Sequence, residues 1–108
     1  MKLDSLNDRQ LLQNTKELVA RERQLVSKIL WHLREVEKRK LFCQLGYQSL
    51  FDYCTRELKY SDGQAGRRIQ AMRLIKELPE VEEKLEEGSL NLTSVCLAAT
   101  HFRNIQKQ

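Results

Sequence analysis

Residues that interrupt helices are scarce in this sequence. Of its 108 residues, one is proline and four are glycine, and β-branched runs are few. Proline and glycine disfavour helix interiors, while β-branched and aromatic residues favour strands. Their scarcity predicts an all-α protein. The length allows one domain with a modest core and is too short for two well-packed domains.

Long apolar runs and paired cysteines are also missing. No stretch approaches the roughly 18 to 20 uncharged apolar residues that a membrane span needs, and residues 1–9 hold no apolar signal core. The cysteines, Cys43, Cys54 and Cys96, form no CxxC pair and leave an odd thiol in any pairing. We therefore expect a cytoplasmic protein with reduced thiols and no membrane partner.

Catalytic and metal-binding patterns are absent too. His32 and His101 stand far apart with no cysteine, histidine or aspartate at metal spacing. No glycine-rich phosphate loop follows a strand, and no GxSxG occurs. The six glutamates from Glu77 to Glu87 suggest the solvated face of a short polar helix more than paired general acids. We expect no enzyme activity, no cofactor, no metal and no small-molecule substrate.

Charge is present in quantity and unevenly distributed. The net charge is +4; twelve basic and eight acidic residues precede Ser61, and seven of each follow, which sum to the 19 and 15 of the whole chain. In the second part Arg67, Arg68 and Arg73 come before the glutamates. A basic element beside an acidic one fits a protein that presents one face to a polyanion. It fits an ordinary solvated surface as well.

A seven-residue apolar repeat dominates the first 45 residues. One row is Leu11, Leu18 and Leu25, a second is Leu12, Val19, Val26 and Leu33, and Ile29, Leu30 and Val36 extend the stripe. This spacing predicts a helix from about residue 6 to 45, opened by a capping box of Ser5 with Asp8 and ended at Gly46. One such helix would be about 60 Å long. Either it breaks near Lys38, Arg39 and Lys40, or it extends unbroken and pairs with another chain.

The stripe predicts a homodimer, because a monomer would otherwise expose an unusually large apolar patch. The dimerisation residues expected are Leu11, Leu18, Leu25, Val26 and Leu33. The alternative is that shorter helices of the same chain cover the stripe.

Four shorter helices are expected in residues 46–108. Ser49 and Asp52 form a capping box for a helix over 50–58, whose Leu50, Phe51, Cys54 and Leu58 face a core. Ser61 and Gln64 form another for a helix that runs to Glu77. Its inner stripe is Ala65, Ile69 and Met72, with Gly63, Arg67, Gln70 and Leu74 opposite. Pro79 begins a helix that ends at Gly88, and Asn91 or Thr93 caps a last one that runs to about Phe102, before a polar tail.

The pair of helices between Leu50 and Leu78 is typical of a helix-turn-helix that binds DNA. Slim and basic residues near the start of the second helix suit a major groove, although an ordinary helical hairpin with solvated arginines has the same spacing. The DNA-binding residues expected are Lys38, Arg39 and Lys40 on phosphates, and Ser61, Gln64, Arg67, Arg68 and Gln70 on the second helix. Arg67 faces outward, whereas Arg68 flanks the inner stripe and either reaches DNA or braces a neighbouring helix.

Two families share motifs with this chain. From Gly46 to Val95 it resembles the helical domain of unknown function that precedes HNH nuclease domains in many bacterial proteins. The matching residues are Gly46, Ser49, Leu50, Ser61, Ala65, Arg67, Leu78, Pro79, Gly88, Leu90 and Leu92. Residues 61–95 are also similar to the helix-turn-helix of plasmid and chromosome partitioning proteins.

These resemblances imply a non-catalytic module that targets an HNH-nuclease-type protein to double-stranded DNA, since the sequence lacks the His-Asn-His segment itself. The rival interpretation is a dimerisation or protein-interaction module whose long helix is the working surface.

Overall fold

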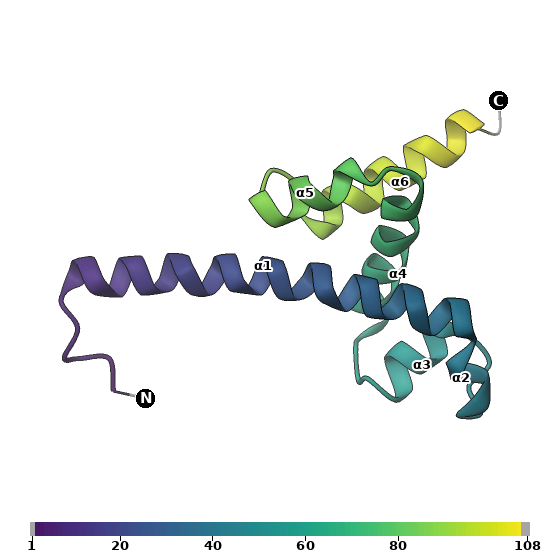
Figure 1. Ribbon diagram of the computed structural model, residues 1–108, viewed down its shortest axis with the longest axis horizontal. Helices are drawn as coiled ribbons and strands as arrows, with labels where there is room; N and C mark the ends of the chain where they lie inside the picture. Colours follow the sequence, from purple (N-terminus) through teal and green to yellow (C-terminus); the bar gives the residue numbers. More distant parts are fainter. Residues whose placement is uncertain (1, 107–108) are drawn as a thin grey trace.

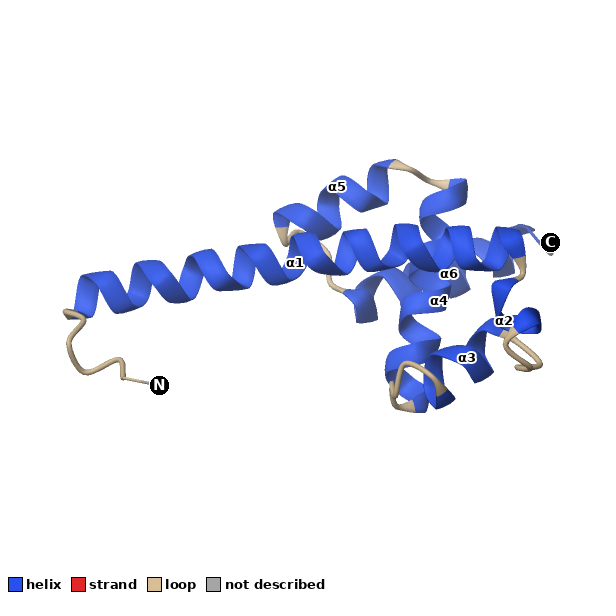
Figure 2. Cartoon of the chain, turned by 60° about the horizontal axis from the view of Figure 1, so that its bottom comes forward, coloured by secondary structure: helices blue, strands red, loops and turns tan. Residues whose placement is uncertain are grey.

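The structure is a computed structural model that describes residues 2–106, except for the side chains of 102, 103 and 106. Over this range it contains helices and loops and no strand (Figure 2), which confirms the all-α expectation. The helices are α1 (Asp8–Arg39), α2 (Leu41–Gln44), α3 (Leu50–Arg56), α4 (Asp62–Glu77), α5 (Glu80–Glu87) and α6 (Leu92–Gln106). The end of the expected polar tail, residues 107 and 108, lies outside the described residues.

The long helix α1 sets the length of the molecule. Its 32 residues span about 48 Å, and the longest extent of the chain is 53 Å. Figure 1 shows α1 running past the other helices, so that its first half projects from the bundle. We call residues 8–22 the arm and residues 23–39 the packed half.

The start of α1 differs from the expected capping box. Asn7, and not Ser5, caps the helix: its side chain accepts from the Gln10 amide at 2.8 Å, and the Gln10 side chain accepts from the Asn7 amide at 3.1 Å. A turn closed by the Leu6 amide on the Leu3 carbonyl precedes it. The turn moves the first helical residue to Asp8, where the next pair with capping-box spacing is available.

The far end of α1 decides between the two alternatives for the long helical pattern. Lys40 adopts the left-handed conformation, with φ 53°, and its amide caps the carbonyls of Val36 and Glu37. The short α2 follows, and Gly46, with φ 89°, ends it. The helix therefore breaks at the basic cluster, as one of the two alternatives predicts.

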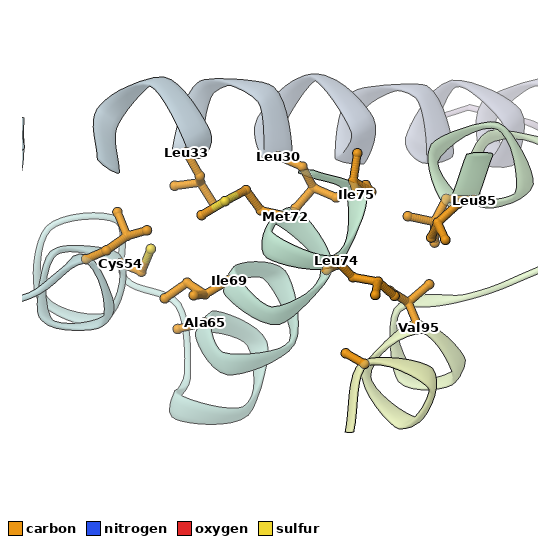
Figure 3. Close-up of a cluster of buried hydrophobic side chains, with 14 residues drawn as sticks. Leu30, Leu33, Cys54, Ala65, Ile69, Met72, Leu74, Ile75, Leu85 and Val95 are labelled. Carbon is orange, nitrogen blue, oxygen red and sulfur yellow. The ribbon is translucent and has the colours of Figure 1, made fainter. Parts of the chain in front are cut away.

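Helix α4 lies at the centre of the bundle and contacts α1, α3, α5 and α6. Figure 3 shows Leu30 and Leu33 of α1 facing Met72 of α4, with Cys54 and Val95 on either side. The expected inner residues Ala65, Ile69 and Met72 are buried, and so are Ala71, Leu74 and Ile75. Leu74, expected on the outer side, is only 4% exposed, because α6 packs on that side of α4.

Two residues expected in the core lie at the surface. Leu50 and Cys54 are buried, but Phe51 and Leu58 are exposed. Helix α3 ends at Arg56, so Leu58 falls in the following loop rather than on the buried face. Ser49 caps α3 by accepting from the Asp52 amide at 3.0 Å, but the Asp52 carboxylate accepts from the Gln48 amide and does not close the expected box.

Two polar contacts attach α5 to the packed half of α1. The buried Ser27 hydroxyl donates to the Glu82 carboxylate at 2.8 Å, and the Arg23 side chain donates to the Glu86 carbonyl at 3.1 Å. Gly88 ends α5 with φ 87°, and a Cβ there would lie 3.2 Å from the Arg23 guanidinium. Glu82 is thus half-buried and hydrogen-bonded, unlike the solvated glutamates expected on this helix. Asn91 caps α6 by accepting from the Ser94 amide.

Candidate nucleic-acid interface

The start of α4 is held by the capping box that the sequence predicts. The Ser61 hydroxyl accepts from the Gln64 amide at 3.2 Å, and the Gln64 side chain accepts from the Ser61 amide at 3.0 Å. Before it, Lys59 takes the left-handed conformation, and the Tyr60 amide donates to the Cys54 carbonyl. Ser61 and Gln64 therefore fix where α4 begins and how it leaves α3.

The outward side of the first two turns of α4 is formed by small residues and one arginine. Asp62 and Gly63 are exposed. A Cβ added at Gly63 would meet only the Arg67 guanidinium, at 3.2 Å, and one added at Gly66 would meet nothing within 4 Å. The Arg67 side chain therefore lies against the backbone at Gly63, while the half-buried Gly66 has free space where a Cβ would be.

Arg68 has a different role from Arg67. Its guanidinium carbon lies 4.5 Å from the centre of the Tyr60 ring, and its Nη1 donates to the Gln64 carbonyl at 3.1 Å. Its Nε is buried without a hydrogen-bond partner. Burial raises the pKa of the nearby Cys54 thiol, and the positive charge of Arg68 opposes that rise. Arg68 therefore packs on Tyr60 in the loop between α3 and α4 and not on a neighbouring helix.

Gln70, one turn after Arg67 on α4, is half-buried. The Cys96 thiol of α6 donates to the Arg67 carbonyl at 3.4 Å. Helix α6 thus already contacts α4 in its second turn.

The basic cluster at the end of α1 lies near the other end of α4. Arg39 forms an ion pair with Glu35 at 2.8 Å, and this hydrogen bond lowers the pKa of Glu35. The preceding turn is linked to α4 by an ion pair of Glu37 with Arg73, also at 2.8 Å. Lys40 forms the left-handed break. Ser61 and Arg73 are twelve residues apart, about 18 Å along a helix. The expected DNA-binding residues therefore fall into two separate groups, one at the start of α4 and the other at the end of α1.

Lys38 belongs to a surface that the sequence did not predict. It lines a hollow of about 490 Å³ between α1 and α4, together with Trp31, Arg34, Glu35, Glu37, Met72 and Lys76. The spacing of Trp31, Arg34 and Lys38 places these three on one helical face, and that signal was available in the sequence. Lys76 and Met72 join them only through the packing of α4 on α1.

Four of the five expected dimerisation residues remain accessible. Leu11, Leu18 and Leu25 are exposed, Leu18 at 60% and Leu25 at 56%, and Val26 is half-buried. Leu33 is only 3% exposed because it packs in the core of its own chain, so it cannot contribute to a surface between two copies without unfolding.

No histidine, cysteine, aspartate and glutamate cluster able to hold a metal occurs in residues 2–106, and His32 is exposed, with its Nδ1 2.6 Å from the Lys28 carbonyl. None of the helices in that range has the length and apolarity needed to cross a membrane.

Comparison with protein-family models, curated proteins and solved structures finds no match to this chain.

Proposed function

We propose that this chain binds double-stranded DNA through the first two turns of α4. Gly66 carries the proposal, because none of the described residues lies within 4 Å of the place that a Cβ would occupy there, so packing does not call for a glycine. Glycine in a helix costs roughly 0.5 to 1 kcal/mol relative to alanine, so Gly66 weakens α4 without improving internal packing. A surface that approaches the backbone closely, such as the floor of a major groove, supplies a reason for it.

Charge around Gly66 supports a phosphate-bearing partner. Arg67 lies beside the glycines, and the unpaired amides at a helix N-terminus also favour phosphate. Asp62 opposes this attraction, since its carboxylate is exposed in the same turn. Removing that charge with Asp62→Asn should therefore strengthen binding.

Fluorescence anisotropy with random duplex and single-stranded DNA across a salt series tests the proposal. Arg67→Ala should weaken duplex binding by about 1 to 3 kcal/mol if Arg67 contacts a base, or weaken all sequences alike and reduce the salt slope by about one if it contacts phosphate. Arg68→Ala should weaken binding less. Glu83→Gln, on the exposed face of α5, is the control that should not weaken it. No measurable affinity at about 50 mM salt would exclude the proposal.

Gly66→Ala separates this function from a structural role. Alanine should raise the free energy of unfolding by about 0.5 to 1 kcal/mol, because a Cβ has room there. It should weaken duplex binding at the same time, since the Cβ occupies the approach surface. A thermal melt and an anisotropy titration measure the two effects. A stabilised variant with unchanged affinity would contradict a close approach at Gly66.

The DNA-binding module that we propose has no catalytic activity of its own and serves a larger HNH-nuclease-type protein. The resemblance of residues 46–95 to the domain that precedes HNH nucleases supports this part of the proposal. Purified chain incubated with plasmid and magnesium, manganese or zinc should leave the DNA intact. Nicking that survives repurification and is blocked by EDTA would overturn this part.

The alternative that we propose is a dimerisation module without DNA binding, and the exposed leucines of the arm favour it. The row of Leu11, Leu18 and Leu25 continues into two apolar hollows, of about 780 and 620 Å³, which share Leu25 and Ile29 as lining residues. A second copy of α1 laid along this row would cover the leucines that the bundle leaves exposed. The same contact is compatible with DNA binding, because a dimer would present two α4 helices.

A further inference from the structure

Trp31 is exposed although it belongs to the packed half of α1. It is the only tryptophan of the chain, and 62% of its surface is accessible. The indole lines the hollow of about 490 Å³ described above and also a smaller one of about 190 Å³. Arg34, Met72 and Lys76 line both hollows as well. The aromatic ring therefore lines two hollows that share the cations Arg34 and Lys76, and the smaller one is also lined by Glu82, whose carboxylate accepts from Ser27.

The charges around Trp31 are unbalanced. Glu35 and Glu37 line the larger hollow, but they are neutralised by ion pairs with Arg39 and Arg73. Among the described residues, no carboxylate lies within ion-pair distance of Arg34, Lys38 or Lys76, although the charges of Lys38 and Arg34 add to the hydrogen bond from Arg39 in lowering the pKa of Glu35. Three cations beside an exposed indole favour a ligand that carries both negative charge and a flat ring.

We propose that this surface binds single-stranded nucleic acid, with one base stacked on Trp31 and the adjoining phosphates held by Arg34, Lys38 and Lys76. An aromatic platform beside cations is how proteins hold single strands without sequence preference. The larger hollow falls within the range of about 300 to 1,000 Å³ found for small-ligand sites, which leaves room for a nucleotide. A duplex does not fit this chemistry, because its bases are stacked on one another and offer no free ring face.

This surface is separate from the start of α4. Ser61 and Lys76 are fifteen residues apart on one helix, about 22 Å. The inference therefore does not rest on the duplex binding proposed above, and variants at the two places distinguish them.

Titration with a 12-nucleotide oligothymidine, followed by tryptophan fluorescence, tests the inference. The single tryptophan should be quenched in a saturable way by the oligothymidine, and much less by an abasic strand of equal length or by a duplex. With a labelled oligothymidine in anisotropy, Trp31→Ala should weaken binding about tenfold, as expected for loss of one base stack. Lys76→Gln should weaken it and reduce the salt slope by about 0.7.

Two controls accompany these variants. Lys84→Gln removes one equal charge from the exposed face of α5 and should leave the affinity unchanged. Circular dichroism should show that Trp31→Ala folds, since the side chain is exposed. If the abasic strand or the duplex quenches Trp31 as strongly as oligothymidine, or if Trp31→Ala binds like the unaltered chain, the base-stacking site is wrong. Loss of duplex binding in Arg67→Ala alone would concern the α4 proposal and not this one.

Discussion

The arm and the packed half of α1 carry the same apolar repeat but lie in different environments. The arm projects into solvent, whereas the packed half lies against the other helices (Figure 1). Val19 in the arm is 44% exposed, whereas Leu33, which belongs to the same row in the packed half, is 3% exposed. The difference lies in what stands opposite: α4 and α5 pack against α1, with the first polar contact to α5 at Arg23. An apolar period thus predicts a helix and the residues that share a face, but the rest of the chain decides whether that face is covered.

Within the packed half, only some residues of the apolar stripe are buried in the core. The core contacts of the packed half centre on Leu30 and Leu33, while Leu25 remains 56% exposed. At 100° per residue, Leu25 and Leu30 point about 140° apart. The row of Leu11, Leu18 and Leu25 therefore runs beside the core face and not along it. This geometry is consistent with the proposal that a second copy of α1 covers that row.

Truncating one leucine in each half should give the largest contrast in stability. Leu30→Ala removes a fully buried side chain from between α1 and α4, and should lower the free energy of unfolding by about 2 to 5 kcal/mol. Leu18→Ala, measured where the chain is monomeric, should change it by less than about 0.5 kcal/mol. Urea denaturation followed by circular dichroism measures both. Equal losses would mean that the arm is covered within one chain.

Charging the exposed row tests whether the arm joins two copies. The unaltered chain should have twice the single-chain mass of 12.8 kDa by light scattering at micromolar concentration. Leu18→Lys should raise the dissociation constant about 100-fold, which corresponds to ~2.7 kcal/mol. Leu97→Lys, which adds the same charge at an exposed position of α6, is the control and should leave the dimer intact. A single-chain mass for the unaltered protein would exclude the dimer.

The local features of the fold could be predicted from the sequence because they depend on neighbouring residues. The capping box of Ser61 with Gln64 and the glycine ends at Gly46 and Gly88 involve contacts within a few positions. The expected start of α1 is wrong because Asn7 with Gln10 has equivalent spacing two residues later, directly after the turn at residues 3–6.

The tertiary features could not be predicted in the same way. Leu74 was expected outside because a period identifies one buried face, and a central helix such as α4 is buried on several. The surface around Trp31 was missed because Lys76 joins it across 45 positions of sequence, through the packing of α4 on α1. The pairing of Ser27 with Glu82 is also non-local, so Glu82 looked like its solvated neighbours.

Removing the hydroxyl of Ser27 should give a moderate effect in the packed half. Ser27 is 3% exposed and donates to the half-buried Glu82 carboxylate, so Ser27→Ala should cost about 1 to 2 kcal/mol of unfolding free energy. In the arm, the Thr15 hydroxyl donates only to the Leu11 carbonyl of its own helix. Thr15→Ala should therefore be neutral or slightly stabilising, because alanine is the better helix former. A reversed order would contradict the docking of α5 through Glu82.

The smallest change in the free energy of unfolding is expected at the boundary between the arm and the packed half. Arg23 is half-buried and donates to the Glu86 carbonyl, where its guanidinium also packs on Gly88. Arg23→Gln should lower the free energy of unfolding by about 0.5 kcal/mol, the lower end for a hydrogen bond that solvent can reach. Arg21→Gln removes the same charge from an exposed position two residues earlier and should cause no measurable change. Replicate urea curves of the two variants, fitted with a shared slope, resolve the difference. If both variants lose the same amount, net charge and not the contact with α5 is responsible, and the packed half begins after Arg23, at Ser27.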